Sequence, residues 1–332
     1  MNKVIITGGG GFVGKAIVRA AIAEGAQVRV IGRHSYLDVE DIGGQCLVGD
    51  ICDRAFLFDA VSDADVVFHV AALAGIWGRW QDYYAVNYQG TENVVAACLR
   101  NGIKSLVYTS TPSVVFDSKD IAGGDETLPY ATTFLCHYAR SKAMAEQLVL
   151  GTNGSELATC ALRPHLVWGP GDPHLIPRLL ERGRLGQLKQ VGAGTNLVDI
   201  SYVDNVAHAH ILAAKNLQKN RSAAGKAYFI GQEAPVNLWE WINELFVRVG
   251  VAPVRKKVSF PVAYGAGAVL EMAHRAFFPH REPKMTRFLA EQLARSHYFT
   301  HQNSCNDLGY RPLVSTELGM QFLVDWITRH EI

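Results

Sequence analysis

A short apolar segment at the start of the chain leads directly into a run of four glycines. Residues 3–7 have the composition of a buried strand, residues 13–24 have helical periodicity, and Gly8, Gly11 and Gly14 recur at every third position between them. We expect Gly8 to permit the tight turn, Gly11 to let the backbone approach a phosphate, and Gly14 to let the helix pack closely. This order of elements predicts a dinucleotide site.

Apolar runs of strand length alternate with helical patterns through the N-terminal half of the chain. Further strands are expected at residues 27–31, 46–48, 66–70, 105–109 and 159–163, and a clear helix at 90–100. Continuous apolar strands separated by amphipathic helices indicate a parallel sheet covered on both faces. We therefore predict an α/β fold with a Rossmann-like, doubly wound parallel sheet.

The pattern loosens after about residue 163. The expected helices are 175–182, 204–216, 238–249, 262–277 and 316–329, and the expected short strands are 196–202 and 227–230. We predict a dinucleotide-binding domain over residues 1–165, to which residues 195–232 partly return. Residues 166–332 are predicted to form a smaller, mostly helical region that binds substrate or acts as a lid.

Composition excludes several classes of function. The 32 lysines and arginines nearly balance 31 acidic residues, so nothing indicates nucleic-acid binding. None of the six cysteines forms a CxxC pair, and we predict no metal site and reduced thiols. No basic leader or membrane-spanning stretch is apparent, so we expect a cytoplasmic protein. The most apolar stretch, residues 260–278, is interpreted as a lid, a core helix or a peripheral membrane contact.

The end of the second strand bears on the choice of cofactor. It reads Gly32-Arg33-His34-Ser35, without the carboxylate that would bind ribose hydroxyls. A guanidinium there suits a 2′-phosphate, so NADP(H) is favoured over NAD(H). Alternatively, Arg33 stacks on adenine, which fits either cofactor. Asp50, at the end of the third strand, is interpreted as an acceptor for the adenine amino group or as a helix N-cap.

Tyr138 and Lys142 stand four residues apart, on one face of an expected helix. A nearby ammonium favours the phenolate, which would make the tyrosine a general acid or base near neutral pH. Hydroxyl groups follow the fifth strand at Ser110, Thr111 and Ser113, at the sheet edge where ligands bind in such folds. These hydroxyls are interpreted as substrate-oxygen ligands or as turn caps beside Pro112.

The chain resembles the extended short-chain dehydrogenase/reductase superfamily, and within it the 3β-hydroxysteroid dehydrogenase family. The matching segments are residues 7–14, Gly49-Asp50, His69-Val70-Ala71-Ala72, residues 87–91, Thr109-Ser110-Thr111, Tyr138 with Lys142, and Arg163-Pro164. The narrower match lies in residues 112–116, 125–130, 162–165, 169–177 and 196–206. Residues 74–78 resemble the bacterial 2-alkyl-3-oxoalkanoate reductases of olefin synthesis. Residues 116–126 resemble the sterol-4α-carboxylate 3-dehydrogenases.

The resemblance implies a role for each site residue. Tyr138 would be the acid/base, Lys142 would hold the nicotinamide ribose, and Thr111, with Ser110 in reserve, would bind the substrate oxygen. The residues expected to contact the cofactor are Gly8, Gly11, Phe12, Val13, Arg33, Asp50, Ile51, Ala71, Ala72, Tyr138, Lys142, Pro164 and His165.

The implied activity interconverts a 3-oxo and a 3-hydroxy group on a lipid-like or sterol-like, carboxylated substrate. Arg79, His165 and Arg178 are candidate cations for that carboxylate, and Trp77 and Trp80 are candidates for an apolar lid. A homodimer is expected through the helices near residues 90–100 and 138–150. Two other interpretations remain: a sugar-nucleotide epimerase, dehydratase or reductase, and a non-catalytic NADP(H)-binding sensor.

Overall fold

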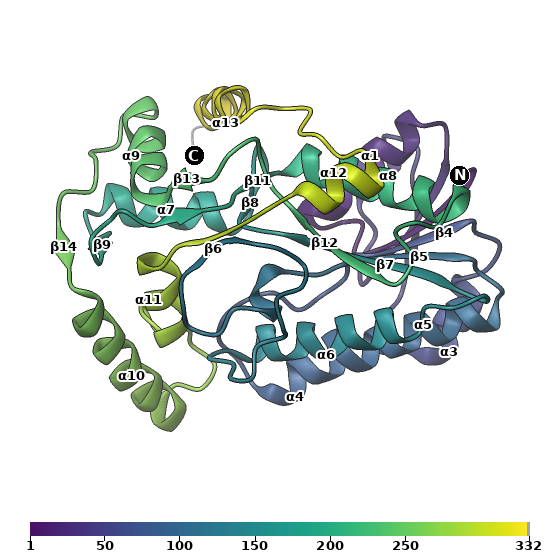
Figure 1. Ribbon diagram of the computed structural model, residues 1–332, viewed down its shortest axis with the longest axis horizontal. Coiled ribbons are helices and arrows are strands. Elements are labelled where there is room, and N and C mark those ends of the chain that lie inside the picture. Colours follow the sequence, from purple (N-terminus) through teal and green to yellow (C-terminus); the bar gives the residue numbers. More distant parts are fainter. Residues whose placement is uncertain (331–332) are drawn as a thin grey trace.

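A computed structural model describes residues 1–330 and contains a seven-stranded, all-parallel sheet at its centre (Figure 1). The strand order is β12-β7-β5-β4-β1-β2-β3, so the direction of winding reverses between β4 and β1. The strands are β1 (Lys3–Thr7), β2 (Gln27–Gly32), β3 (Gln45–Val48), β4 (Val66–His69), β5 (Ser105–Thr109), β7 (Ala158–Pro164) and β12 (Lys226–Ile230). The predicted doubly wound α/β class is confirmed, and ligands of such sheets bind beside the reversal point.

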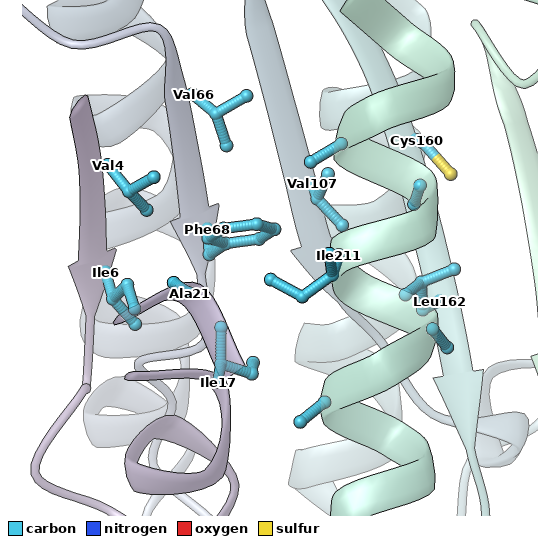
Figure 2. Close-up of a cluster of buried hydrophobic side chains, with 14 of the residues drawn as sticks. Val4, Ile6, Ile17, Ala21, Val66, Phe68, Val107, Cys160, Leu162 and Ile211 are labelled. Carbon is cyan, nitrogen blue, oxygen red and sulfur yellow. The ribbon is translucent and has the colours of Figure 1, made fainter. Parts of the chain in front are cut away.

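Helices cover both faces of this sheet. One face carries α1 (Phe12–Ala23) and α8 (Val203–Lys219), and the other carries α3 (Arg54–Ala60), α5 (Gly90–Arg100) and α6 (His137–Gly151). The strands are apolar throughout because alternate residues enter different cores: Val4 and Ile6 join the α1 and α8 side, whereas Ile5 joins the other. Figure 2 shows the first of these cores.

The single strand predicted at residues 196–202 is wrong in detail. The structure has two short strands, β10 (Leu197–Val198) and β11 (Ser201–Tyr202), which belong to different sheets. Between them the buried carboxylate of Asp199 accepts a hydrogen bond from the Phe299 backbone N–H at 2.8 Å. This hydrogen bond joins residues 100 positions apart, and the sequence pattern gives no sign of it.

The C-terminal part of the chain forms a second apolar core beside the sheet. Its sheets use β6 (Ile121–Gly124), β8 (Val167–Trp168), β9 (Gln190–Val191), β13 (Val236–Asn237), β14 (Lys257–Val258) and β15 (His297–Phe299), together with β10 and β11. Its helices are α7 (Leu175–Arg184), α9 (Leu238–Arg248), α10 (Phe260–Phe277), α11 (Arg287–Ala294) and α13 (Thr316–His330), and α12 (Gln302–Leu308) packs on α8. The division near residue 165 stays a prediction.

The sequence pattern also missed several short elements. These are α2 (Leu37–Glu40), α4 (Trp80–Tyr83), a π-helical turn (Tyr84–Gln89) and a 3₁₀ turn (Pro112–Val114). The π-helical turn joins α4 directly to α5, so residues 80–100 form one helical rod with a wide turn inside it. Such turns are rare and frequently occur at functional sites.

Candidate active site

The glycine turn between β1 and α1 requires glycine at two positions. Gly8 has φ +70°, and a Cβ there would lie 2.7 Å from the Ala71 Cα. A Cβ at Gly14 would overlap the carbonyl oxygen of Gly8. Gly11 is the N-cap of α1 and has no capping side chain, so first-turn N–H groups of α1 remain available to an anion.

This turn forms one wall of a cavity of about 560 Å³ at the carboxyl edge of the sheet. Its volume is within the range of small-molecule and cofactor sites. The predicted residues that line it are Gly8, Gly11, Phe12, Val13, Arg33, Asp50, Ile51, Ala71, Ala72, Ser110, Thr111, Tyr138, Lys142 and Pro164. Residues separated by more than 150 positions in sequence thus meet around one space.

At the end of β2, Gly32 and the exposed Arg33 line the cavity, together with Tyr36. Asp50, at the end of β3, accepts a hydrogen bond from the Cys52 backbone N–H at 2.9 Å. Asp50 therefore stabilises its own turn while also lining the cavity. The sequence interpretation missed Tyr36. Its ring packs against Gly32, where a Cβ would leave no room for it. The only indication in the sequence is that Tyr36 follows closely after Arg33.

At the other end of the cavity, Lys142 is almost fully buried. Its Nζ donates to the carbonyl oxygen of Thr109 at 2.6 Å and lies 4.1 Å from the centroid of the Tyr108 ring. Burial lowers the pKa of Lys142 to about 7, although Glu146 acts in the opposite direction. The lysine therefore titrates near neutral pH.

One electrostatic expectation is wrong. We expected Lys142 to lower the pKa of Tyr138, but burial raises the pKa of Tyr138 above its ordinary value. The hydroxyl of Thr111 opposes this shift as a hydrogen-bond partner. Desolvation disfavours the phenolate more strongly than the surrounding groups favour it, so Tyr138 is a neutral phenol at neutral pH.

The hydroxyls after β5 serve two different purposes. Thr111 caps the 3₁₀ turn by accepting from the Ser113 backbone N–H at 3.3 Å, and it also lines the cavity. The Oγ of Ser110 is buried, lines the same cavity and has no hydrogen-bond partner among the described residues. A buried polar atom without a partner is consistent with a site that receives a polar ligand.

A buried network positions the backbone around this cavity. Asn87, in the π-helical turn, accepts from the Leu73 N–H at 2.7 Å and donates to the Ser141 Oγ at 2.9 Å. Ser141 in turn donates to the Tyr138 carbonyl oxygen at 2.9 Å. The wide turn therefore ties the loop after β4 to the first turn of α6. Asn87 belongs to a matched motif, but the sequence alone assigned it no role.

His69 fixes a second part of the cavity wall. Thr91 donates to the Asn87 carbonyl oxygen, so its Oγ1 accepts from the His69 Nε2 at 2.8 Å. The His69 Nδ1 then accepts from Thr7 at 2.7 Å, and the Thr7 oxygen accepts from the Ala71 N–H at 3.2 Å. Burial lowers the pKa of His69 to about 3, so this chain stays neutral and ordered.

His165, which was expected to approach the nicotinamide, is not among the residues that line the cavity. His297 donates from Nε2 to the Gln292 carbonyl oxygen, so its Nδ1 accepts from the His165 Nε2 at 2.6 Å. Burial and the neighbouring His297 hold the pKa of His165 well below its ordinary value. A neutral, buried imidazole cannot serve as the predicted carboxylate cation.

The other two candidate cations already have carboxylate partners. Arg79 donates from Nε and Nη2 to Asp82, at 3.0 and 2.8 Å. Arg178 donates to Glu282 at 2.8 Å. Neither arginine lines the cavity that contains Tyr138. Within residues 1–330, no three His, Cys, Asp or Glu side chains are grouped closely enough to hold a metal ion.

The cavity fits a nicotinamide dinucleotide. Its glycine cradle would be filled by any Cβ at Gly8, uncapped N–H groups of α1 face the phosphate position, and Lys142 and Tyr138 lie at the opposite end. Ala71 and Ala72 form a small apolar wall between the glycine turn and Tyr138, and Arg33 and Asp50, after β2 and β3, line the cavity on the other side of the turn. The glycine turn therefore lies in the middle, and a long molecule with its phosphates in the middle matches this order.

Comparisons with known proteins agree with this geometry. The model of the 3-beta hydroxysteroid dehydrogenase/isomerase family matches residues 5–262. The 2-alkyl-3-oxoalkanoate reductase of Shewanella oneidensis is 46% identical, over 97% of this chain and 86% of that protein. The human sterol-4-alpha-carboxylate 3-dehydrogenase, decarboxylating, is 33% identical, over 96% of this chain and 87% of that protein.

Solved structures share the fold. The crystal structure of gox2253 has a TM-score of 0.81 and 25% sequence identity, and the match covers 99% of both chains. The structure of MoeE5 in complex with UDP-glucose and NAD has a TM-score of 0.76 and 24% identity, with full coverage of both chains. At this identity the second likeness concerns the fold alone.

Proposed function

The chain belongs to the 3-beta hydroxysteroid dehydrogenase/isomerase family and is an NAD(P)-dependent oxidoreductase acting on CH–OH groups; from this premise we propose that it reduces 2-alkyl-3-oxoalkanoates to 3-hydroxy acids with NADPH. The observation that carries the proposal is the convergence of Thr111, Tyr138 and Lys142 on the cavity that contains the glycine turn. Two relatives named for this reduction, at 46% and 45% identity, support the choice of substrate.

In this proposal each residue performs one task. A nicotinamide cofactor held in this cavity would supply the hydride for the ketone carbon. Tyr138 donates its phenolic proton to the ketone oxygen as negative charge develops there. Thr111 donates a hydrogen bond to the same oxygen, with Ser110 next to it. Lys142 holds the ribose hydroxyls with its ammonium group, and its place between Thr109 and Tyr108 fixes its direction.

Two features favour reduction with NADPH. The raised pKa of Tyr138 keeps the phenol protonated, which is the form that a reduction consumes. Arg33, at the end of β2, suits the 2′-phosphate that distinguishes NADPH from NADH. Asp50 would accept from the adenine amino group beside it. Pro164 would contact the nicotinamide ring from the end of β7.

A second candidate is oxidation of a 3β-hydroxysterol-4-carboxylate, favoured by the 33% identity to the human sterol-4-alpha-carboxylate 3-dehydrogenase. Both candidate substrates have a carboxylate on the carbon next to the reacting one. Oxidation gives a 3-oxo acid, which loses CO₂ because the adjacent carbonyl accepts the electron pair. Reduction of the ketone prevents that loss, so the direction decides whether carbon is retained.

A spectrophotometric assay tests the proposal. Because 3-oxo acids lose CO₂ spontaneously, a 2-alkyl-3-hydroxy acid with NADP⁺ is the stable substrate pair, and absorbance of NADPH measures the reaction. We expect turnover with this acid to exceed turnover with a 3β-hydroxysterol-4-carboxylate and with UDP-glucose. A preference for the sterol acid would select the second candidate, and a preference for UDP-glucose would contradict both.

We also propose that α10 contacts a membrane surface when the protein takes up lipid-like substrates from it. Val262, Val269, Met272 and Phe277 expose 60–75% of their surface on this helix. An apolar helix face of this kind binds at a lipid interface. Within residues 1–330, no helix is long and apolar enough to cross a bilayer. Co-sedimentation with phosphatidylglycerol vesicles should occur, and Met272→Glu should abolish it.

We further propose a homodimer that pairs α5 and α6 of one copy with those of another. The two helices lie side by side on one face of the sheet, and Leu99 is 39% exposed on α5. Light scattering at micromolar concentration should give twice the mass of one 36.4 kDa chain. A mass of one chain would contradict this assembly.

A further inference from the structure

A second cavity, of about 540 Å³, lies next to the first. The two cavities share the start of α6, because Cys136 and His137 line the second and Tyr138 lines the first. Its other walls come from the loop after β4, the segment before α6, the C-terminal half of α10 and the start of α11. Most of these segments are outside every motif that led to the first cavity.

One apolar cluster connects Tyr138 with the wall of the second cavity. Tyr138, Ile76, Phe134 and Leu135 pack against the same buried cluster, and the last three line the second cavity. Trp77 adds an aromatic wall, and its indole N–H donates to the Pro279 carbonyl oxygen at 3.1 Å. The same apolar side chains therefore surround Tyr138 and form part of the wall of the second cavity.

Positively charged side chains outnumber negatively charged ones in the lining of the second cavity. Glu271 is buried and accepts from the backbone N–H, Nε and Nη2 of Arg287, at 2.7, 3.0 and 2.8 Å. Arg287 therefore makes the close contacts to this carboxylate. Arg275 is its second ion-pair partner, with its Nη2 at 3.7 Å from the same carboxylate. Arg79, the third arginine of the lining, is held by Asp82.

Arg287 and Arg275 thus share one carboxylate, which leaves this group of side chains with one net positive charge, and Arg275 is the more exposed of the two arginines. Its guanidinium carbon lies 5.8 Å from the centroid of the Trp77 ring, which directs the group over an aromatic wall. Its positive potential reaches the floor of the cavity, where burial first and Arg275 second lower the pKa of His137. A cation beside apolar walls is the arrangement that binds the carboxylate of an amphipathic acid.

We propose that the second cavity binds the carboxylate-bearing part of the substrate, with Arg275 as the carboxylate ligand. The inference rests on the proposed function for the identity of that substrate as a 2-alkyl-3-oxo acid. It follows that Arg275 selects the intact acid over the ketone that remains after CO₂ is lost. The site then distinguishes two molecules that present the same carbonyl group to Tyr138.

A pair of unreactive ligands tests this site without turnover. 2-Hexyldecanoate and 2-hexyldecan-1-ol have the same branched chain, differ in charge, and lack a 3-oxo group. Calorimetry on the NADP⁺-bound enzyme should show about 10- to 100-fold tighter binding of the acid. Arg275→Gln should remove that preference and leave the alcohol's affinity unchanged. Arg281→Gln, a nearby exposed arginine outside the cavity lining, is the control and should retain the preference.

The outcomes separate the inference from the proposed function. An acid preference that survives in Arg275→Gln, or that is absent from the unaltered protein, overturns the inference even if 2-alkyl-3-hydroxy acids are oxidised. Loss of the preference in Arg275→Gln alone supports the site, even if those hydroxy acids give no turnover and the proposed function fails.

Discussion

The two cavities beside Tyr138 are built by different means. The first is formed by the ends of parallel strands and by backbone groups of a glycine turn, and its one buried cation, Lys142, contacts a carbonyl oxygen rather than a carboxylate. The second is formed by loops and two late helices, and its charges are three arginines and one buried carboxylate, that of Glu271. The first cavity therefore depends on backbone shape, whereas the second depends on exchangeable side chains.

This difference between the cavities indicates which positions tolerate substitution. A Cβ at Gly8 or Gly14 meets backbone atoms that cannot move away, whereas Arg79 and Arg275 of the second cavity are exposed and can be replaced without touching the core. We expect substitutions in the first cavity to affect every substrate equally. Substitutions in the second cavity should change which substrate is chosen.

The largest expected effect is on Tyr138, which lines the first cavity. Tyr138→Phe removes the proton donor but keeps the ring, so turnover should fall by at least about 10³-fold while NADPH affinity stays within about twofold. Stopped-flow NADPH oxidation and fluorescence titration measure the two quantities. Tyr298→Phe, on β15 and outside both cavity linings, is the control. Unchanged turnover in Tyr138→Phe would remove the assigned acid.

Arg33 tests the cofactor end of the first cavity. Arg33→Ala should weaken NADPH binding about 10- to 100-fold, because a charged hydrogen bond to the 2′-phosphate is lost, and should barely affect NADH. Calorimetric titration of both cofactors gives the ratio, and Arg54→Ala on α3 serves as the exposed-arginine control. Equal losses for the two cofactors would show that Arg33 only stacks on adenine.

One glycine substitution in each region tests how closely other atoms pack against the backbone there. Gly14→Ala forces a methyl group against the Gly8 carbonyl oxygen and should lower the free energy of unfolding by about 1–3 kcal/mol. Gly265, in the interior of α10, has no atom within 4 Å of a built Cβ. Gly265→Ala should raise the free energy of unfolding by about 0.5–1 kcal/mol. Urea unfolding measures both, and a destabilised Gly265→Ala would contradict the comparison.

The last expected effect, which needs no substitution, is a pH dependence confined to the first cavity. The pKa of Lys142 is about 7, so its ammonium form predominates below that pH and is lost above it. We expect kcat/KM for NADPH to fall about tenfold per pH unit above pH 7, since this ratio reports the free enzyme. A flat profile to pH 9 would show that the lysine keeps its proton. Any residual activity of Lys142→Arg should lack the decline.

The parts of the site predictable from sequence are those fixed by local spacing. The glycine turn follows one strand within seven residues, and Tyr138 and Lys142 share one helical turn, so their joint position follows from geometry alone. The direction of the pKa shift of Tyr138 could not be predicted from spacing in the same way. Lys142 was expected to lower the pKa of Tyr138, yet burial, which spacing does not reveal, raises it.

The parts that escaped prediction depend on contacts between distant segments. His165 was assigned to the cofactor, but it pairs with a histidine 132 positions later. The second cavity needs α10 and α11 to fold back on the loop after β4, some 200 positions earlier, as in the contact of Trp77 with Pro279. No periodicity within either segment indicates its partner. The predicted fold class was confirmed because strand and helix patterns depend on residues that are close in sequence.

The late arrival of β12 has a consequence for how the protein is made. The sheet is completed by residues 226–230, and α1 packs against α8, which ends at Lys219. A nascent chain released only to residue 165 would have an unpaired edge on β7 and no cover for the apolar side of α1. During translation, the sheet that supports the dinucleotide cavity cannot be completed until some 65 further residues have been synthesised. We therefore expect the nascent chain to depend most on chaperones in that interval.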